Sequence, residues 1–111
     1  MIALVLLAGA LGAVIRFLVA RLVATPWAVL VVNVVGSLVG GVVIGATSGD
    51  LRVILLTGFC GGLTTFSSFT VETVQLVLEG RARKALLSAG LNLVLGVGAA
   101  ALGLALSTLF R

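Results

Sequence analysis

Apolar residues fill four long stretches of the chain, and short clusters of polar and charged residues separate these stretches. The stretches cover approximately residues 2–23, 27–47, 51–78 and 85–110. A helix of about 20 apolar residues crosses the roughly 30 Å hydrocarbon core of a bilayer. The pattern therefore predicts an all-α integral membrane protein with four transmembrane helices, forming a single transmembrane domain over residues 1–111.

The third stretch differs from the others because small and hydroxyl-bearing residues crowd its centre. Its run from Gly58 to Phe69 reads Gly-Phe-Cys-Gly-Gly-Leu-Thr-Thr-Phe-Ser-Ser-Phe. Irregular backbone at membrane depth is tolerated only where it is buried in protein or lines a water-filled cavity. We therefore predict a third helix that is broken near its centre, with backbone groups able to hold an ion. The alternative is that Gly58 and Gly62 only allow close helix packing.

Side chains beyond this run fall on two neighbouring helical faces. Residues three or four positions apart share a face, so Phe66 and Phe69 form an aromatic stripe, and Thr65, Ser68 and Glu72 form a polar one. Ring edges carry partial positive charge and hydroxyls donate hydrogen bonds, so both stripes could contact a partly dehydrated anion. The alternative is that the phenylalanines are packing residues.

Polar side chains also interrupt the second and fourth stretches. Asn33 should face inward because an amide in hydrocarbon is unfavourable, and it either lines a pore or hydrogen-bonds a neighbouring helix. Ser88 and Asn92 lie four residues apart and share one face of the fourth helix. Two facing polar stripes, in the third and fourth helices, would make a narrow polar route.

Basic residues gather near the ends of the apolar stretches, where they anchor helices to lipid headgroups. The net charge is +4, yet 61% of the residues are hydrophobic and only 9% are charged, so we expect a lipid bilayer and no nucleic acid as the partner. Arg52 and Arg111 lie on the side of the termini, and the other side carries Arg21, Arg81, Arg83 and Lys84. The positive-inside rule then favours outside termini, while the small bias leaves fixed and dual topology open.

Few groups in the chain could carry covalent or acid–base chemistry. There is no histidine, one cysteine and three acidic residues, so an enzyme is not expected. Arg16, about one turn inside the first stretch, either reaches the headgroups or lends positive potential to an anion entrance. Glu72 is the one acid well inside a stretch, and either proton coupling or a helix-end or ion-pair role would explain it.

Three segments together make a distinctive pattern: the early Arg16, the run Asn33-Val34-Val35-Gly36-Ser37, and Gly-Gly-Leu-Thr-Thr-Phe-Ser-Ser-Phe from Gly61 to Phe69. The pattern resembles the CrcB or Fluc family of small fluoride channels. The resemblance implies a fluoride-selective channel in the plasma or inner membrane that exports cytoplasmic fluoride by passive diffusion. It also implies an antiparallel dimer with a central structural sodium ion (Na⁺), formed as a homodimer or as a heterodimer with a homologous subunit.

The same resemblance assigns roles to individual residues. It implies that the backbone carbonyls of Gly61 and Thr64 hold sodium. The implied fluoride pore is lined by Asn33, Thr65, Phe66, Ser67, Ser68 and Phe69. Many relatives carry a tyrosine one turn before a serine in the fourth span, whereas this chain has no tyrosine and places Ser88 and Asn92 there. An outer polar track through these two residues would therefore differ from the family pattern.

Two other functions are compatible with four apolar helices. A small proton-coupled multidrug transporter would be expected to carry an essential acid in its first span, and Met1 to Val23 contains none. A structural membrane subunit would explain the packing glycines. It gives no reason for hydroxyls, paired phenylalanines and Asn33 to occupy inward positions together, so a fluoride channel is the expected function.

Overall fold

The computed structural model describes residues 1–24 and 27–110, and within these ranges it contains helices and short connections but no strand. Four helical segments are long and apolar enough to cross a membrane. This finding confirms the predicted all-α fold with four spans. The elements are α1 (Ile2–Leu22), α2 (Trp27–Ala46), α3 (Gly49–Arg52), the π-helix η1 (Val53–Cys60), α4 (Gly61–Leu63), α5 (Ser67–Leu78), α6 (Ala82–Leu106) and the 3-10 helix η2 (Ser107–Phe110).

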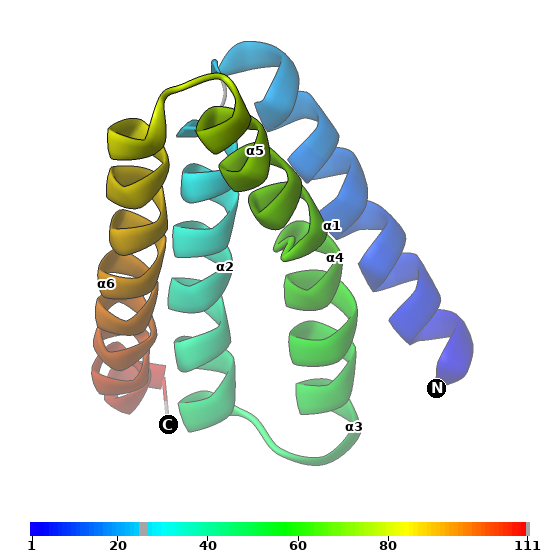
Figure 1. The fold of residues 1–111 in the computed structure, drawn as a ribbon. Coiled ribbons are helices and arrows are strands. Elements are labelled where there is room, and N and C mark those ends of the chain that lie inside the picture. The colour runs from blue at the N-terminus through cyan, green and yellow to red at the C-terminus, as the bar shows by residue number, and fades with distance from the viewer. Residues whose placement is uncertain (25–26, 111) are drawn as a thin grey trace.

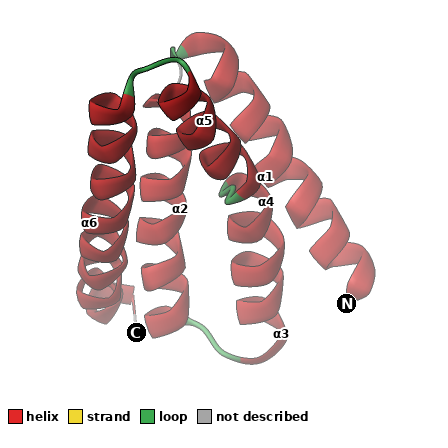
Figure 2. Cartoon of the chain, in the orientation of Figure 1, coloured by secondary structure: helices red, strands yellow, loops and turns green. Residues whose placement is uncertain are grey.

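The third span is assembled from α3, η1, α4 and α5 in succession. Helical geometry stops after Leu63, because Thr64 is extended with φ −81° and ψ 158°. Helix α5 then begins at Ser67. Figure 2 shows this short connection between α4 and α5 about halfway along the span. The Thr64 N–H still donates to the Cys60 carbonyl, and the Phe66 carbonyl still accepts the Thr70 N–H. The backbone groups between these two are therefore the ones available for partners outside the helix.

Glycines bring the backbone of α1 against that of the third span. A Cβ atom on Gly12 would overlap the Phe59 carbonyl of η1, and one on Gly62 would overlap the Gly9 carbonyl of α1. Gly58 is also buried against α1. Small residues allow helices to approach this closely in membranes. Gly58 and Gly62 therefore allow close packing of the third span against α1.

Helices α2 and α6 form a second close pair. A Cβ atom on Gly41 of α2 would overlap the Ala100 carbonyl, and one on Gly103 of α6 would overlap the Leu38 carbonyl. Helix α2 holds more buried residues than any other element, and Figure 1 shows it between α6 and the third span. The large exposed side chains are mostly leucine and valine, as a lipid-facing surface requires. Side chains of α2 therefore reach both neighbouring spans.

Both described ends of the chain lie on one side of the bundle, together with the loop from α2 to α3 (Figure 1). The end of α1 and the turn from α5 to α6 lie on the opposite side. Arg21, Arg81 and Arg83 therefore share a side, as the sequence predicted, and Arg52 lies on the other. Arg111 is outside the described residues.

The fourth span begins earlier than the predicted range of 85–110. Helix α5 ends at Leu78, Gly80 adopts a positive φ of 77° in the turn, and α6 begins at Ala82. Arg83 and Lys84 therefore lie within the helix. Arginine and lysine are good helix formers and are stable at a lipid interface, so the hydropathy boundary marks the edge of the hydrocarbon and not the end of the helix.

Arg52 closes the C-terminal end of α2, a role that the sequence pattern did not predict. Its Nη2 donates to the Ile44 carbonyl at 2.8 Å and also to the Thr47 carbonyl. The last carbonyls of a helix lack intrahelical donors, and a cation near them also interacts favourably with the helix dipole. The second and third spans are thereby joined at the side of the termini.

Candidate functional site

Asn33 of α2 is hydrogen-bonded to the non-helical backbone of the third span. Its Oδ1 accepts a bond from the Thr65 N–H at 2.9 Å, and its Nδ2 donates to the Thr65 carbonyl at 3.2 Å. The two groups would otherwise need partners in a low-dielectric environment, where an unsatisfied one costs about 1–3 kcal/mol. The Asn33 side chain therefore stabilises the interruption between α4 and α5.

The interruption removes the helical donors of the Gly61 and Thr64 carbonyls. In an α-helix each N–H donates to the carbonyl four residues earlier. Here the Thr65 N–H donates to Asn33 and not to Gly61, and the Ser68 N–H donates to Thr65 Oγ1 at 3.1 Å and not to Thr64. These are the two carbonyls that the resemblance assigns to sodium. Carbonyl oxygens are ligands that hard cations prefer.

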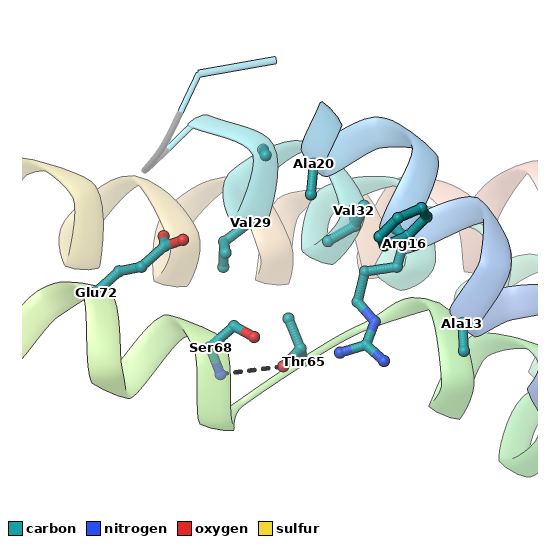
Figure 3. Close-up of a pocket in the computed structure, with 10 residues that line it drawn as sticks. Ala13, Arg16, Ala20, Val29, Val32, Thr65, Ser68 and Glu72 are labelled. Carbon is teal, nitrogen blue, oxygen red and sulfur yellow. Dashed lines mark hydrogen bonds between the residues drawn. The ribbon is translucent and has the colours of Figure 1, made fainter. Parts of the chain in front are cut away.

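A cavity of about 300 Å³ opens between α1, α2 and the first turns of α5. Its polar lining consists of Arg16, Thr65, Ser68 and Glu72. Figure 3 shows the Arg16 guanidinium reaching toward Thr65, with Ser68 beside Thr65 and Glu72 farther along α5. The polar stripe predicted for the third span therefore faces one cavity, and Arg16 points into that cavity.

Arg16 and Glu72 do not pair with each other. Within the described ranges, the one ion pair joins Arg81 to Glu79 at 3.5 Å on the surface. Arg16 Nε and Glu72 Oε2 are buried atoms without a hydrogen-bond partner among the described residues. Buried polar atoms are nearly always satisfied by protein, water or ligand. The cavity is therefore suited to water or a polar ligand.

A second cavity, of about 390 Å³, shares Thr65 with the first. Its lining includes Asn33, Phe66, Phe69 and Asn92 from three different spans. The two phenylalanine rings have centroids 6.1 Å apart and planes inclined by 53°. Phe66 is 79% exposed, so the other helices of this chain leave its ring largely uncovered. An aromatic face and two amides thus border the same space.

The remaining predicted residues lie in different positions. Ser67 is exposed and its Oγ lies 3.4 Å from Thr65 Oγ1. Ser88 is buried, and its carbonyl accepts a bond from Asn92 Nδ2 at 2.9 Å. Asn92 also reaches the second span, where its Oδ1 accepts a bond from Asn33 Nδ2 at 3.1 Å. The polar stripe of the fourth span therefore contacts α2 directly, and Asn92 shares the second cavity with the phenylalanines of the third.

Ser37 is a lining residue of the second cavity that the sequence interpretation did not assign to the site. It lies four positions after Asn33, so the two side chains share a face of α2. That spacing is the signal that could have identified it. By contrast, no local pattern predicts the bond between Asn33 and Asn92, which are 59 residues apart.

Four apolar spans around two cavities that each contain several polar side chains define a multi-pass membrane protein. Residues 3–104 match the family described as CrcB-like protein, Camphor Resistance (CrcB), and the chain belongs to this family. The predicted resemblance is thereby confirmed.

Alignments with named relatives cover most of the chain. It is 47% identical over 105 residues to the fluoride-specific ion channel FluC 1 of Nocardia farcinica, an alignment covering 88% of this chain and 74% of that protein. Identity to FluC 2 of Rhodococcus jostii is 43% over 110 residues, with 95% and 96% covered. Identity to FluC of Thermus thermophilus is 42% over 111 residues, with 90% and 89% covered. These names belong to ion channels, in agreement with the expectation that the chain is not an enzyme.

Proposed function

We propose that this chain forms a fluoride-selective channel through which cytoplasmic fluoride leaves the cell by passive diffusion. Membership of a family whose named relatives are fluoride-specific channels supports the choice of ion. The observation that carries the proposal is that Thr65 lines both polar cavities. Arg16 borders one cavity, and the phenylalanine pair borders the other. An anion passing Thr65 would therefore move between a cationic and an aromatic environment.

The first cavity has the properties of an anion entrance. Arg16 provides a positive charge, which raises the local concentration of anions in a cleft with low-dielectric walls. Thr65 Oγ1 accepts the Ser68 N–H and lies 3.4 Å from Ser67 Oγ, where either hydroxyl can donate. An anion would recruit one of these O–H groups as its donor. Ser68 provides a further hydroxyl in this cavity, and Ser67, beside it at the start of α5, adds one next to Thr65. Such donors replace part of the hydration shell of an ion that leaves bulk water.

Phe66 and Phe69 form the apolar part of the proposed pore. Aromatic rings carry positive charge at their edges and negative charge on their faces. The 53° inclination of the two planes lets one ring present its edge where the other presents its face. A small anion can approach an edge closely, whereas a larger anion would displace a ring. This difference is the proposed basis of fluoride selectivity.

We infer that a sodium ion is held at the interruption by the carbonyls of Gly61 and Thr64. Both have lost their helical N–H donors to side-chain oxygens. Backbone carbonyls are oxygen ligands, the type that hard cations prefer. When bound, the ion supplies a fixed positive charge close to the pore. The residues present therefore fit a hard cation.

An antiparallel dimer completes this proposal. Hard cations collect about six oxygen ligands, more than two carbonyls of one chain provide, and Gly61 is exposed where a second subunit could reach it. Phe66 is also left largely uncovered by its own chain. The excess of basic residues on one side favours a fixed orientation, which suits a heterodimer with a homologous subunit, while its small size also permits a homodimer of dual topology.

Liposomes that contain this chain alone are expected to release fluoride and to retain chloride. The measurement loads vesicles with potassium fluoride or potassium chloride, adds valinomycin, and follows the external anion with an ion-selective electrode. Fluoride efflux that appears only after a homologous subunit is added would identify the heterodimer. No fluoride efflux under either condition would contradict the proposed function.

Removal of sodium is expected to weaken the dimer. Protein purified in N-methyl-D-glucamine chloride should show a lower unfolding temperature and a smaller dimer fraction than protein in sodium chloride, because the organic cation is too large for a site of carbonyls. Sodium added back should restore both values saturably, as a ligand that binds only the folded state does. Potassium chloride at equal ionic strength is the control. Equal unfolding temperatures with and without sodium would argue against the ion site.

A further inference from the structure

The lining of the first cavity carries one basic and one acidic side chain, Arg16 and Glu72. Figure 3 shows Arg16 beside Thr65 and Glu72 farther along α5. Helix α5 runs from the interruption toward the side where α1 ends, so an anion that enters from that side passes Glu72 before it reaches Arg16. These two opposite charges largely offset each other at a distance. A further cation on that side therefore decides whether the cavity attracts anions.

Ala20 and Ala28 form the mouth of this cavity, because they lie in the last turn of α1 and the first turn of α2. Arg21 directly follows Ala20, and its side chain is exposed. In the part of the chain that the structure describes, the one ion pair joins Arg81 to Glu79, so no carboxylate there neutralises Arg21. The charge of Arg21 is therefore available at the mouth.

The ring of Phe17 holds the Arg21 side chain beside the cavity. The guanidinium carbon of Arg21 lies 5.8 Å from the centroid of this ring, within the range of a cation–π interaction. The two residues are four positions apart and share a face of α1, and a helical side chain points back over the preceding turn. Phe17 itself lines the cavity. The ring therefore keeps the positive charge of Arg21 next to the route into the cavity.

We propose that Arg21 is the outer residue that attracts anions to the mouth of the channel, and that Phe17 is a positioning residue that holds it there. The proposal rests on the proposed fluoride channel and places a second cation in front of Arg16. The two arginines are five residues apart, which corresponds to about 7.5 Å along the axis of α1. Arg21 raises the local anion concentration beside Glu72, and Arg16 then receives the ion near Thr65.

Anchoring to lipid headgroups is the other role of an arginine at the end of a span. An anchor needs a long basic side chain but no aromatic ring beneath it. It also affects insertion and orientation, and not the conductance of a channel that has already assembled. Measurements on single channels, with the ring and the charge removed separately, therefore distinguish the two roles of Arg21.

Single-channel recording in bilayers of neutral lipid provides the first test. At about 0.01 M sodium fluoride, where the Debye length is about 30 Å, Arg21→Gln is expected to lower fluoride conductance about twofold. At about 1 M the Debye length falls to about 3 Å, and the difference should disappear. Arg83→Gln removes a charge on the same side, from a residue outside the cavity lining, and should lose clearly less. Equal losses in these two variants, or a loss in Arg21→Gln that does not depend on salt, would overturn the inference.

A double-mutant cycle tests the positioning role of Phe17. Phe17→Leu retains every charge but removes the ring, so it should lower conductance with the same dependence on salt as Arg21→Gln. Adding Phe17→Leu to Arg21→Gln should then cause no further loss that depends on salt, because both changes act on the same charge. If the two losses multiply in the double variant, the ring acts independently of Arg21 and the positioning role is wrong.

Fluorescence provides a measurement that does not require conduction. Trp27 is the only tryptophan of the chain and directly precedes Ala28 at the mouth. At low ionic strength, iodide should quench Trp27 less in Arg21→Gln than in the original protein, whereas the neutral quencher acrylamide should quench both equally. Weaker iodide quenching of Arg21→Gln, in a protein that conducts no fluoride, supports the attraction of anions while contradicting the channel. Equal iodide quenching of the two proteins overturns the inference, whether or not fluoride is conducted.

Discussion

Replacement of Asn33 by leucine is expected to abolish fluoride efflux, because it removes the partner that holds the interruption of the third span open. Leucine leaves the Thr65 N–H and carbonyl without their hydrogen bonds, at a cost of about 1–3 kcal/mol for each unsatisfied group. The nearest substitute acceptor for the Thr65 N–H is the Gly61 carbonyl, four residues earlier. The span should therefore become more regularly helical, and the geometry around Thr65 should be lost.

Val35→Leu is the matched control for this experiment. It introduces the same residue on the same helix, at a side chain that is 44% exposed. Flux from liposomes and hydrogen exchange at the Thr65 amide should both remain at the original values in Val35→Leu and both change in Asn33→Leu. The two proteins are compared by the ratio of their efflux rates. If assembled Asn33→Leu releases fluoride within about twofold of the original rate, the hydrogen bonds between Asn33 and Thr65 are not needed for conduction.

Substitution of the aromatic pair is expected to have a comparably large effect. Phe66→Ile and Phe69→Ile remove the ring edges but keep a large apolar side chain. A lost anion contact worth about 1.4–2.8 kcal/mol at the barrier lowers the rate about 10- to 100-fold. Each variant should therefore conduct fluoride much more slowly while its dimer fraction in size-exclusion chromatography stays the same.

Two observations make this test specific. Phe66 is largely exposed within its own chain, so its replacement removes little packing from the subunit. Phe110→Ile, at the end of η2, applies the same chemical change outside the residues assigned to the pore. We expect this control to conduct normally. If both Phe66→Ile and Phe69→Ile conduct at the original rate, the aromatic pore assignment is wrong.

The spans could be predicted from the sequence because the bilayer imposes a length on every apolar helix. The alternation of sides then follows from the number of crossings. It places the end of α1, which carries Arg21, beside the start of α6, which follows Arg81, as observed. Arg83 and Lys84 show the limit of this reasoning, because they lie within α6. Charged residues indicate where a span reaches the aqueous interface, whereas the end of a helix depends on backbone hydrogen bonds.

Composition also indicated which part of the third span is unusual, but it did not distinguish the roles of its residues. Gly58 and Gly62 contact the backbone of α1, while residues 64–66 are the ones between the two helical parts of the span. That difference depends on Asn33, which lies 32 residues from its partner Thr65. Contacts between distant segments leave no periodic signal in a single sequence.

The bonds between Asn33 and Thr65 have a consequence for the order in which the protein assembles. A third span surrounded by lipid, with α2 not yet beside it, has no donor or acceptor for its backbone except itself. It must then be a continuous helix in which the Thr65 N–H bonds to the Gly61 carbonyl. Only after α2 packs beside the third span can the Asn33 oxygen replace the Gly61 carbonyl as the acceptor for the Thr65 N–H. The interruption is therefore a product of tertiary folding within the bilayer, and helix insertion precedes formation of both polar cavities.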